Sequence, residues 1–375
     1  MKITDVKVQR YGQRREDGTR AGGEIQTVQL ETDEGVSGLG FVTANNSRIS
    51  PTADLVAGLI RQNLRNIVLG EDPILTDALW QRMYDQVTGR RGARGFVLQC
   101  IAAIDFACWD IKGKRMGRPV GDLFGQRRSR IPTYANAAHL LAPAEVAKTA
   151  AAYVAKGHTA IKIRGGLNAG TTKEATARVQ AVREAIGPDI KLMVDVNGTW
   201  DADIAIQQLR DWESYDLYWL EEPCHPDDIP GYVRVRQYAG DVYITGGEQH
   251  SGVIEFRSLL ENEAVDILQP GAGGVGGITE WLRVYNLATA YGVPVSPWNL
   301  QSVHIHMAAG LSNVKWIEYF MPDNQMLDFQ TRLFKEPLFR EETTSEGVFL
   351  LPPDKPGLGI VLDEAEAERH IISEP

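Results

Sequence analysis

Three segments between residues 191 and 249 decide the fold: 191-KLMVDVNG-198, 217-LYWLEEP-223 and 242-VYITGGEQ-249. Each is a short apolar run that stops at a carboxylate, namely Asp195, Glu221 or Glu248. This pattern is typical of a buried parallel strand whose C-terminal end holds a ligand. The spacing between the carboxylates is even and equals roughly one strand plus one crossover helix. We therefore expect the three side chains to lie together on neighbouring strands.

Three converging carboxylates favour a divalent cation. Hard oxygen ligands suit Mg²⁺, which keeps its other positions for water and substrate. A single carboxylate at a strand end is usually a helix cap or a surface group. Three in register, with no Lys or Arg placed to neutralise them, are hard to explain without a cation.

Length and composition limit the class of protein. The 375 residues suffice for a barrel domain of about 250 residues and a second domain. The net charge of -10 argues against nucleic acid and acidic membranes as partners. The start MKITDVKVQR is unlike a signal peptide, and no apolar run is long enough to span a membrane. Three scattered cysteines fit a reducing compartment, so we expect a cytoplasmic protein.

Residues 1–125 predict an α+β capping domain, with strands followed by helices. Two polar segments, 12-GQRREDGTRAGG-23 and 43-TANNSRISP-51, read as loops and supply Arg20 and Arg48 as candidate substrate-binding residues. A helix is expected to start at Ser50 as N-cap with Pro51 in its first position. The helical run 96–117 is apolar at helical spacing, so its Asp105 and Asp110 are interpreted as structural.

From residue 126 to about 345 the pattern alternates between strand and helix, which predicts a TIM-type barrel. Its active site should lie where the strands end. Residues 346–375 carry short β segments and are expected to return to the capping domain. Eight strands are predicted, at residues 131–135, 159–164, 191–196, 217–221, 242–246, 265–269, 293–296 and 315–319.

The second predicted barrel strand, 160-AIKIRGG-166, places Lys162 and Arg164 on one side because strand side chains alternate. Two interpretations stay open. The two cations could neutralise the carboxylates in an ordinary salt-bridge network. Alternatively, Lys162 beside another cation has a lowered pKa and acts as a base, while Arg164 clamps a substrate carboxylate.

At this point the chain resembles the mandelate racemase subgroup of the enolase superfamily. The resemblance rests on IDFACWDIKGKRMGRPVGDLFG, KIR, DVNG, WLEEP, GGEQ, DILQPGAGGVGGITE and IEY, which extend over nearly the whole length. It implies an α/β fold, a modified (β/α)7β barrel with a capping domain. It also implies Mg²⁺ bound by Asp195, Glu221 and Glu248, abstraction of a proton alpha to a carboxylate, and a homo-oligomer, either a dimer or an octamer.

Two departures from the family pattern limit what the resemblance implies. Many members pair an Asp after the sixth strand with a His after the seventh, but here Gly271 and Trp298 stand at those positions. Arg164 stands where a more familiar lysine base would be, and arginine is a poor base because its pKa exceeds about 12. Proton abstraction then depends on Lys162, on an unusual neutral Arg164, on the two as a pair, or on a group outside these motifs.

Further side chains are candidates for the site. Glu318 matches a residue that donates to the substrate carboxylate when protonated, although a core partner to Lys315 is an alternative. His304 and His306 lie in an apolar helical run and are interpreted as structural. The remaining candidates for substrate contact are Tyr134, Asn136, Asn197, His250 (as an acid) and Trp298 (as a wall for a sugar chain). For Tyr134, Asn136 and Trp298, ordinary packing inside the barrel is the competing interpretation.

The expected activity is Mg²⁺-dependent dehydration of an acid sugar, a mono- or diacid, to a 2-keto-3-deoxy product, which makes the protein a hydro-lyase. An epimerase or a sugar-lactone cycloisomerase on the same scaffold is the alternative. A racemase normally needs a base on each face of the substrate, and only one face is supplied here. A non-catalytic protein that binds an acid sugar is a third possibility from a different class.

Overall fold

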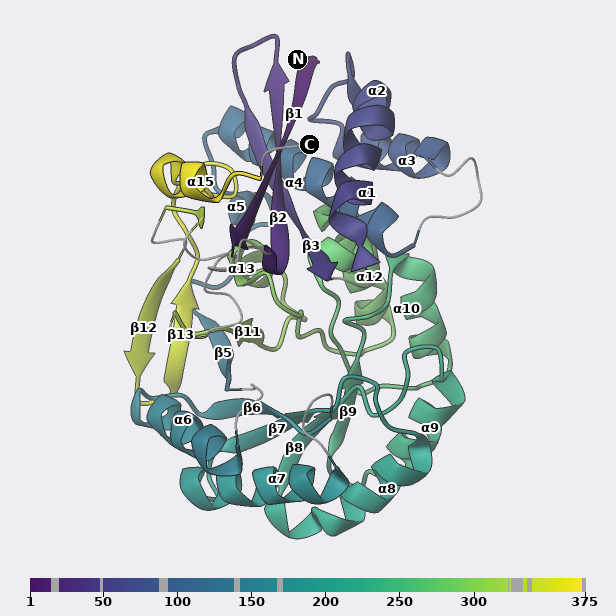
Figure 1. Ribbon diagram of the computed structural model, residues 1–375, viewed down its shortest axis with the longest axis vertical. Coiled ribbons are helices and arrows are strands. Elements are labelled where there is room, and N and C mark those ends of the chain that lie inside the picture. The colour runs from purple at the N-terminus through teal and green to yellow at the C-terminus, as the bar shows by residue number, and fades with distance from the viewer. Residues whose placement is uncertain are drawn as a thin grey trace.

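The computed structural model describes residues 1–14, 20–47, 50–87, 94–137, 142–166, 171–322, 324, 333–335 and 339–372. Arg48 lies outside these residues, and only the backbone of Arg20 is described. An antiparallel sheet with helices beside it lies above a barrel that is ringed by helices (Figure 1). No helix in the described ranges is long and apolar enough to cross a membrane.

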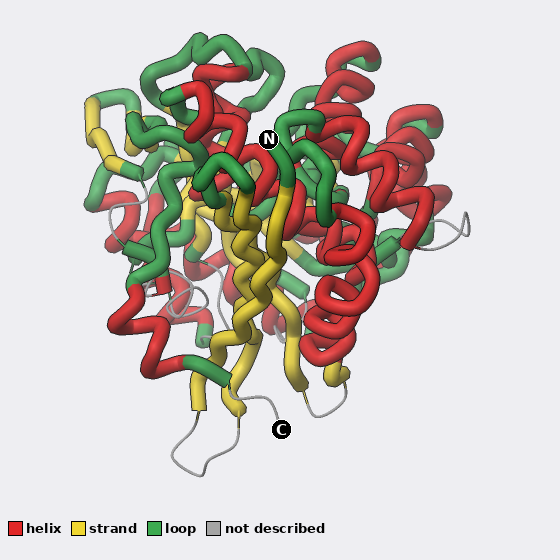
Figure 2. The backbone as a smooth tube through the Cα atoms, turned by 90° about the horizontal axis from the view of Figure 1, so that it is seen from above, coloured by secondary structure: helices red, strands yellow, loops and turns green. Residues whose placement is uncertain are grey.

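The upper layer is a four-stranded antiparallel sheet with helices packed beside it, and Figure 2 shows its strands from above. The strands β2 and β3 form a hairpin around Asp33, Glu34 and Gly35. Ser50 and Pro51 pair with β3, so α1 starts at Thr52 and not at Pro51, the predicted first position. The elements are β1 (Ile3–Arg14), β2 (Arg20–Thr32), β3 (Gly38–Ser47), β4 (Ser50–Pro51), α1 (Thr52–Leu59), a π-helical turn (Ile60–Leu64), α2 (Arg65–Val68), α3 (Thr76–Val87), α4 (Phe96–Met116) and α5 (Val120–Leu123).

Helix α4 is buried on nearly every side and joins this layer to the barrel. Strand β3 lies so close to it that a β-carbon at Gly40 would be 1.8 Å from the carbonyl oxygen of Ala103, so only glycine fits there. Asp105 accepts hydrogen bonds from the backbone N–H (3.0 Å) and hydroxyl (2.5 Å) of Thr279, at the start of α12 (Ile278–Ala290). Asp105 is therefore structural, as predicted.

The barrel is a ring of parallel strands whose first and last members, β5 and β11, are hydrogen-bonded to each other. Its strands are β5 (Ile131–Asn136), β6 (Ala160–Arg164), β7 (Lys191–Asp195), β8 (Leu217–Glu221), β9 (Tyr243–Gly246), β10 (Ile267–Leu268) and β11 (Ile317–Tyr319). The predicted seventh strand, at 293–296, is reduced to single bridges from Val295 to Leu268 and Val314. Pro294 lies within this segment and Pro297 directly follows it, and neither can donate to a ladder, which explains the interruption.

Helices between the strands cover the outside of the barrel (Figure 1). Thr171 caps α7 through the backbone N–H of Glu174, and Asp201 caps α8 through that of Ile204. The helices are α6 (Pro143–Ala155), α7 (Thr172–Ile186), α8 (Ala202–Asp211), a 3₁₀ turn (Glu213–Tyr215), α9 (Ile229–Tyr238), α10 (Gly252–Glu261), α11 (Ala272–Val275), α12 and α13 (Gln301–Gly310).

The C-terminal residues add a hairpin to the barrel before the chain returns to the upper layer. Strand β13 (Gly347–Leu351) pairs with β12 (Arg340–Thr344) and also, antiparallel, with β5. The boundary expected at residue 346 therefore divides one hairpin, and the correction is that 347–351 lie with the barrel sheet. Beyond the hairpin, α15 (Glu364–His370) packs beside β1, and Ile371 forms a bridge with Tyr11.

The register of the parallel strands brings the predicted residues to one end of the barrel. Arg164 pairs with Asp195, Asp195 with Glu221, and Glu221 with Thr245. Glu248 differs from the expectation in one respect, because β9 ends at Gly246 and Glu248 lies in the turn after it. That turn bends through Gly247, which has a φ of 125° that few other residues tolerate.

Candidate active site

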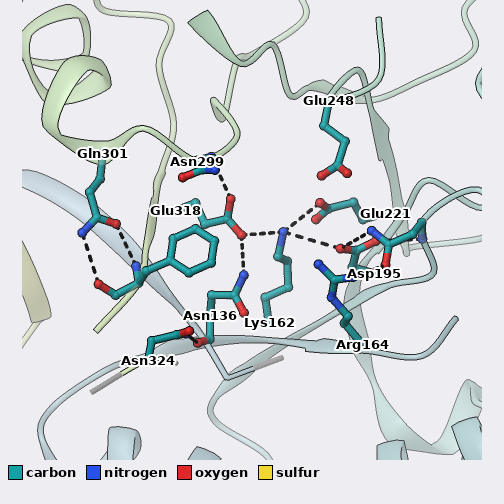
Figure 3. Close-up of polar contacts among 12 residues, drawn as sticks. Asn136, Lys162, Arg164, Asp195, Glu221, Glu248, Asn299, Gln301, Glu318 and Asn324 are labelled. Atoms are coloured by element: carbon teal, nitrogen blue, oxygen red, sulfur yellow. Dashed lines mark hydrogen bonds and ion pairs between the residues drawn. The ribbon is translucent and has the colours of Figure 1, made fainter. Parts of the chain in front are cut away.

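Asp195, Glu221 and Glu248 come together at the mouth of the barrel, as predicted (Figure 3). Each offers a carboxylate oxygen, and these oxygens lie within 4.8 Å of one another. Asp195 and Glu221 are buried, and Oε2 of Glu221 and Oε2 of Glu248 have no hydrogen-bond partner among the described residues. A buried carboxylate oxygen without a donor is costly, so the geometry calls for a cation at this point.

The pKa shifts of Glu221 and Glu248 also favour a cation at this point. Burial raises the pKa of Glu221 to about 7, although Lys162 opposes the rise. Burial also raises the pKa of Glu248 well above its ordinary value, and repulsion from Glu222 and Asp195 adds to the rise. Both shifts reflect negative charge that the described side chains do not neutralise. An oxygen-only donor set with this charge fits Mg²⁺.

Lys162 forms a salt-bridge network at the centre of the site (Figure 3). Its Nζ is 2.8 Å from Oε1 of Glu221, 2.7 Å from Oε1 of Glu318 and 3.9 Å from Oδ2 of Asp195. Burial lowers the pKa of Lys162, but the attraction of Glu221 and Glu318 outweighs it and the pKa is raised well above the ordinary value. The expectation that Arg164 lowers this pKa is therefore wrong for the metal-free arrangement, because carboxylates rather than Arg164 surround the ammonium group.

Arg164 is connected to Asp195 through the side-chain amide of Asn197 and, within the described residues, forms no ion pair with a carboxylate of the triad. Its Nη1 donates to Oδ1 of Asn197 at 2.8 Å. Asn197 in turn donates to both oxygens of Asp195, from its backbone N–H at 2.9 Å and from Nδ2 at 3.0 Å. Arg164 thus has one buried donor, Nε, without a hydrogen-bond partner in the described ranges.

Glu318 is held in one orientation by three donors. Besides Lys162, Nδ2 of Asn136 lies 2.6 Å from its Oε1, and the backbone N–H of Asn299 lies 2.9 Å from its Oε2. Lys315, the alternative partner, instead lies over the rings of Tyr218 and Tyr243. Glu318 therefore belongs to the site, and Asn136 positions it.

Tyr134 lies beside this network, and its side chain is fully buried. Its ring centroid is 5.5 Å from Nζ of Lys162 and 4.9 Å from the ring of Trp219, which it meets edge-on. Burial and the charge of Glu318 raise the pKa of its hydroxyl well above the ordinary value, so the group stays protonated. The hydroxyl has no hydrogen-bond partner in the described part of the chain and is available as a donor.

Gly271 and Trp298 pack against each other after the sixth and seventh barrel segments. A β-carbon at residue 271 would lie 2.9 Å from Cε3 of Trp298, so the indole occupies the space that a larger side chain at residue 271 would need. Trp298 is half-buried. The two residues make this side of the mouth apolar.

Not all of the other predicted residues lie in the site. His250 is buried, its ring lies 5.8 Å from that of Phe256, and burial lowers its pKa to about 4, so it is neutral near pH 7 and does not fit the role of an acid. His304 and His306 each bridge two backbone groups and are structural in that sense. Arg48 lies outside the described residues, as does the side chain of Arg20.

Two residues of the site were missed in the sequence. Asn299 directly follows Trp298 and orients Glu318 through its backbone, which side-chain chemistry does not reveal. Glu222 is fully buried, has a φ of 47°, and has no hydrogen-bond partner for either carboxylate oxygen among the described residues. Burial and the neighbouring Asp195 and Glu221 raise its pKa well above the ordinary value. The doubled glutamate of LEEP was the available signal.

Comparison with known families identifies the class of protein. Residues 2–125 match the family model of the mandelate racemase/muconate lactonizing enzyme N-terminal domain. Residues 145–366 match the model described as enolase C-terminal domain-like. The chain therefore belongs to the mandelate racemase/muconate lactonizing enzyme family of the enolase superfamily, which confirms the resemblance seen in its motifs and the predicted barrel with a capping domain.

Individual relatives act on acid sugars. A 3,6-anhydro-alpha-L-galactonate cycloisomerase of Streptomyces coelicolor is 31% identical over 343 residues, which cover 91% of this chain and 89% of the relative. An arabinonate dehydratase of Saccharolobus solfataricus is 30% identical over 355 residues, which cover 92% and 90%. The crystal structure of an L-talarate dehydratase from Polaromonas sp. JS666, in complex with Mg and L-glucarate, matches with a TM-score of 0.85 at 29% identity, covering 100% of this chain and 98% of the other.

Proposed function

We propose that this protein is a Mg²⁺-dependent dehydratase that removes water from an acid sugar and forms a 2-keto-3-deoxy acid. The observation that carries the proposal is the buried carboxylate triad beside Lys162 and the partly unpaired Arg164. The dehydratase relatives from Saccharolobus and Polaromonas support the reaction class. The Polaromonas structure, which contains Mg and L-glucarate, supports the choice of metal and of a hydroxylated carboxylate as substrate.

The chemistry needs help because a proton alpha to a carboxylate is very weakly acidic. Mg²⁺ held by Asp195, Glu221 and Glu248 would stabilise the negative charge that develops on the substrate carboxylate. Arg164, whose Nε has no described partner, binds and orients that carboxylate. Lys162 and Glu318 lie 2.7 Å apart, so both reach the same end of the substrate, where proton transfer takes place.

Dehydration uses this arrangement in two steps. The bond between the α-carbon and its proton breaks, the proton passes to a base, and the electron pair forms an enediolate. The carbon–oxygen bond at the β-position then breaks, and the hydroxide leaves with a proton as water. The resulting enol becomes the 2-keto-3-deoxy acid by taking a proton at carbon 3. No oxidant or reductant is consumed, so a nicotinamide or flavin is not needed.

The opposite side of the mouth argues for dehydration over racemisation. Racemisation needs a proton-transfer group on each face of the α-carbon. Gly271 and Trp298 lie after the sixth and seventh barrel segments, and neither carries such a group. Among the described residues, the groups suited to proton transfer therefore lie on the side of Lys162 and Arg164, where one base suffices for elimination.

Cycloisomerisation of a sugar lactone or anhydro sugar is the second candidate. It too begins with removal of the α-proton from one face, and the Streptomyces relative is a cycloisomerase. The half-buried indole of Trp298 offers a flat apolar surface of the kind that suits the ring of a cyclic sugar. The products distinguish the two reactions, because dehydration consumes a hydroxyl whereas cycloisomerisation keeps the molecular formula.

The test is incubation of the protein with Mg²⁺ and a panel of four- to six-carbon sugar mono- and diacids, their lactones and anhydro derivatives, followed by NMR and mass spectrometry. A product that is one water lighter and contains a 2-keto-3-deoxy group supports the dehydratase. An isomer of the substrate would transfer the assignment to a cycloisomerase or epimerase. Saturable binding of an acid sugar without any turnover would identify a non-catalytic binding protein and reject the proposal.

A further inference from the structure

A buried histidine ties together the loops that follow the sixth and seventh barrel segments. The backbone N–H of Ala272 donates to Nε2 of His304 at 3.0 Å, and Nδ1 of His304 donates to the carbonyl oxygen of Asn299 at 2.5 Å. Burial lowers the pKa of His304 to about 4, so the ring is neutral and its one proton belongs on Nδ1. Both ring nitrogens are thus used for backbone groups of two different loops.

Through Asn299, the hydrogen bond from His304 is connected to the carboxylate of Glu318. The N–H of Asn299 donates to Oε2 of Glu318 at 2.9 Å, and Oε1 of Glu318 lies 2.7 Å from Nζ of Lys162. Figure 3 shows Asn299, Glu318 and Lys162 in this order. The N–H and the carbonyl of Asn299 belong to successive peptide units that are joined at its α-carbon. The backbone conformation at Asn299 therefore helps to place the Glu318 carboxylate, together with Asn136 and Lys162.

That conformation is strained and needs support. Asn299 has a φ of 55° and Leu300 a φ of 41°, two successive non-glycine residues in the left-handed region. Such a backbone persists only where its surroundings hold it. Gln301, which follows Leu300, is fixed by two hydrogen bonds between its side-chain amide and the backbone of Phe320, at 3.1 and 2.9 Å. The N–H of Leu300 donates to Oδ1 of Asn299 at 2.7 Å, and the carbonyl oxygen of Leu300 accepts from the N–H of His304 at 2.9 Å. The His304 ring adds a hydrogen bond at the Asn299 carbonyl itself.

We propose that His304 is a positioning residue for the reaction: its hydrogen bond to the Asn299 carbonyl holds the strained loop so that the Asn299 N–H fixes Glu318 against Lys162. This inference rests on the proposed function for its kinetic part. The residue touches neither the metal triad nor the space above it; it acts through Asn299. It differs in this from the purely structural role expected of it from its apolar helical surroundings.

The same helix contains a matched control. His306 is also fully buried in α13, and burial lowers its pKa to about 4. Its Nδ1 accepts from the N–H of Gly121 at 3.1 Å, and its Nε2 donates to the carbonyl oxygen of Leu358 at 3.0 Å. These bonds connect α13 to α5 and to the C-terminal residues, away from Glu318. Replacing either histidine removes comparable packing and hydrogen bonds, but only His304 is connected to Glu318 by hydrogen bonds.

The test compares four variants: His304→Asn, His304→Gln, His306→Asn and His306→Gln. An asparagine amide reaches the position of Nδ1 and keeps a donor for the Asn299 carbonyl, whereas a glutamine amide reaches the position of Nε2 and keeps only the bond from Ala272. We expect His304→Gln to lower kcat roughly 10- to 100-fold, because small displacements of reacting groups cost this much. His304→Asn should retain most of the rate, and both His306 variants should stay within about twofold of wild type.

Thermal unfolding and crystal structures complete the comparison. All four variants should lose stability to a similar degree, and only His304→Gln should lose the 2.9 Å contact between the Asn299 N–H and Glu318. Equal rates for His304→Gln and His306→Gln, with the Glu318 contact intact in both, would overturn the inference. If wild type converts no acid sugar, the proposed function fails, while the crystal structures still decide whether His304 holds the loop.

Discussion

The buried carboxylates of helix α4 and those at the mouth of the barrel are equally hidden from water but are satisfied in different ways. Asp110 accepts from the N–H groups of Leu39 and Leu358, at 2.9 and 2.8 Å, and lies 2.6 Å from Nζ of Lys114. Glu221 and Glu248 each have a buried oxygen without a described donor. A buried acid whose oxygens all have donors joins segments of the fold, whereas converging acids that keep buried oxygens without a described donor mark a place for a cation.

This difference separates stability from function. Removing a carboxylate of the first kind leaves backbone N–H groups unpaired in the interior, and the cost falls on folding. Removing one of the second kind relieves repulsion between like charges in the metal-free protein, and the cost falls on metal binding and catalysis. The predictions below test this separation from the largest expected effect to the smallest.

Glu248→Gln should abolish most activity without destabilising the metal-free protein. The amide keeps an oxygen for Nε2 of Gln249, its partner at 3.0 Å, but removes one negative charge from the triad. Loss of metal-assisted charge stabilisation is expected to cost several kcal/mol, roughly a thousandfold in kcat/KM. Thermal unfolding in EDTA should show a midpoint equal to or above that of wild type. A clear drop in that midpoint would mean that Glu248 supports the fold.

Asp110→Ala should show the opposite behaviour. Two backbone N–H groups and Lys114 lose their partner, so the free energy of unfolding should fall by roughly 2–5 kcal/mol. Urea unfolding measures this loss. The kcat of the folded fraction should remain within a few-fold of wild type, because Asp110 contacts no residue of the triad. Loss of kcat out of proportion to the loss of folded protein would contradict the separation.

Mg²⁺ should stabilise wild type and leave Glu248→Gln almost unaffected. A ligand that binds only the folded state at 100 times its Kd adds about 2.7 kcal/mol to stability. Titration of the unfolding midpoint with Mg²⁺ measures this effect, with Ca²⁺ as a comparison for oxygen ligands. An equal rise for the variant would place the cation elsewhere in the molecule.

Asp105 provides a test of a different kind, the dependence of stability on pH. Burial raises its pKa from 3.8 to about 7 in the folded protein, so folding favours the protonated form. Its contribution is therefore fully present below about pH 4 and is lost as the pH rises through about 7. Asp105→Asn cannot ionise, so its stability relative to wild type should improve between pH 4 and pH 7. A difference that stays constant over this range would show that Asp105 does not titrate there.

Much of this architecture was readable from the sequence because the signals are local. The apolar runs that end in Asp195 and Glu221, and the alternation that places Lys162 and Arg164 on one side, predict the barrel and the metal triad directly. The strand expected at 293–296 is interrupted because Pro294 within it and Pro297 after it cannot donate to a ladder, and the helix expected to start at Pro51 begins one residue later because the backbone of Ser50 and Pro51 pairs with β3.

The features of the site that could not be predicted from the sequence depend on contacts between distant segments. The N–H of Asn299 reaches Glu318 only after the barrel closes, and nothing local indicates that His304 supports this loop. The raised pKa of Lys162 follows from Glu221 and Glu318 on two other strands. Periodicity identifies which residues face the mouth of the barrel, but it does not say which of them touch.

The most direct test of the central claim is exchange of the α-proton in D₂O with an acid sugar that binds, followed by proton NMR with Mg²⁺ and with EDTA. The account predicts exchange or elimination of that proton with Mg²⁺, none with EDTA, and none in Lys162→Ala or Arg164→Ala at unchanged folding. Binding of the sugar with its α-proton fully retained in the presence of Mg²⁺ would contradict the account.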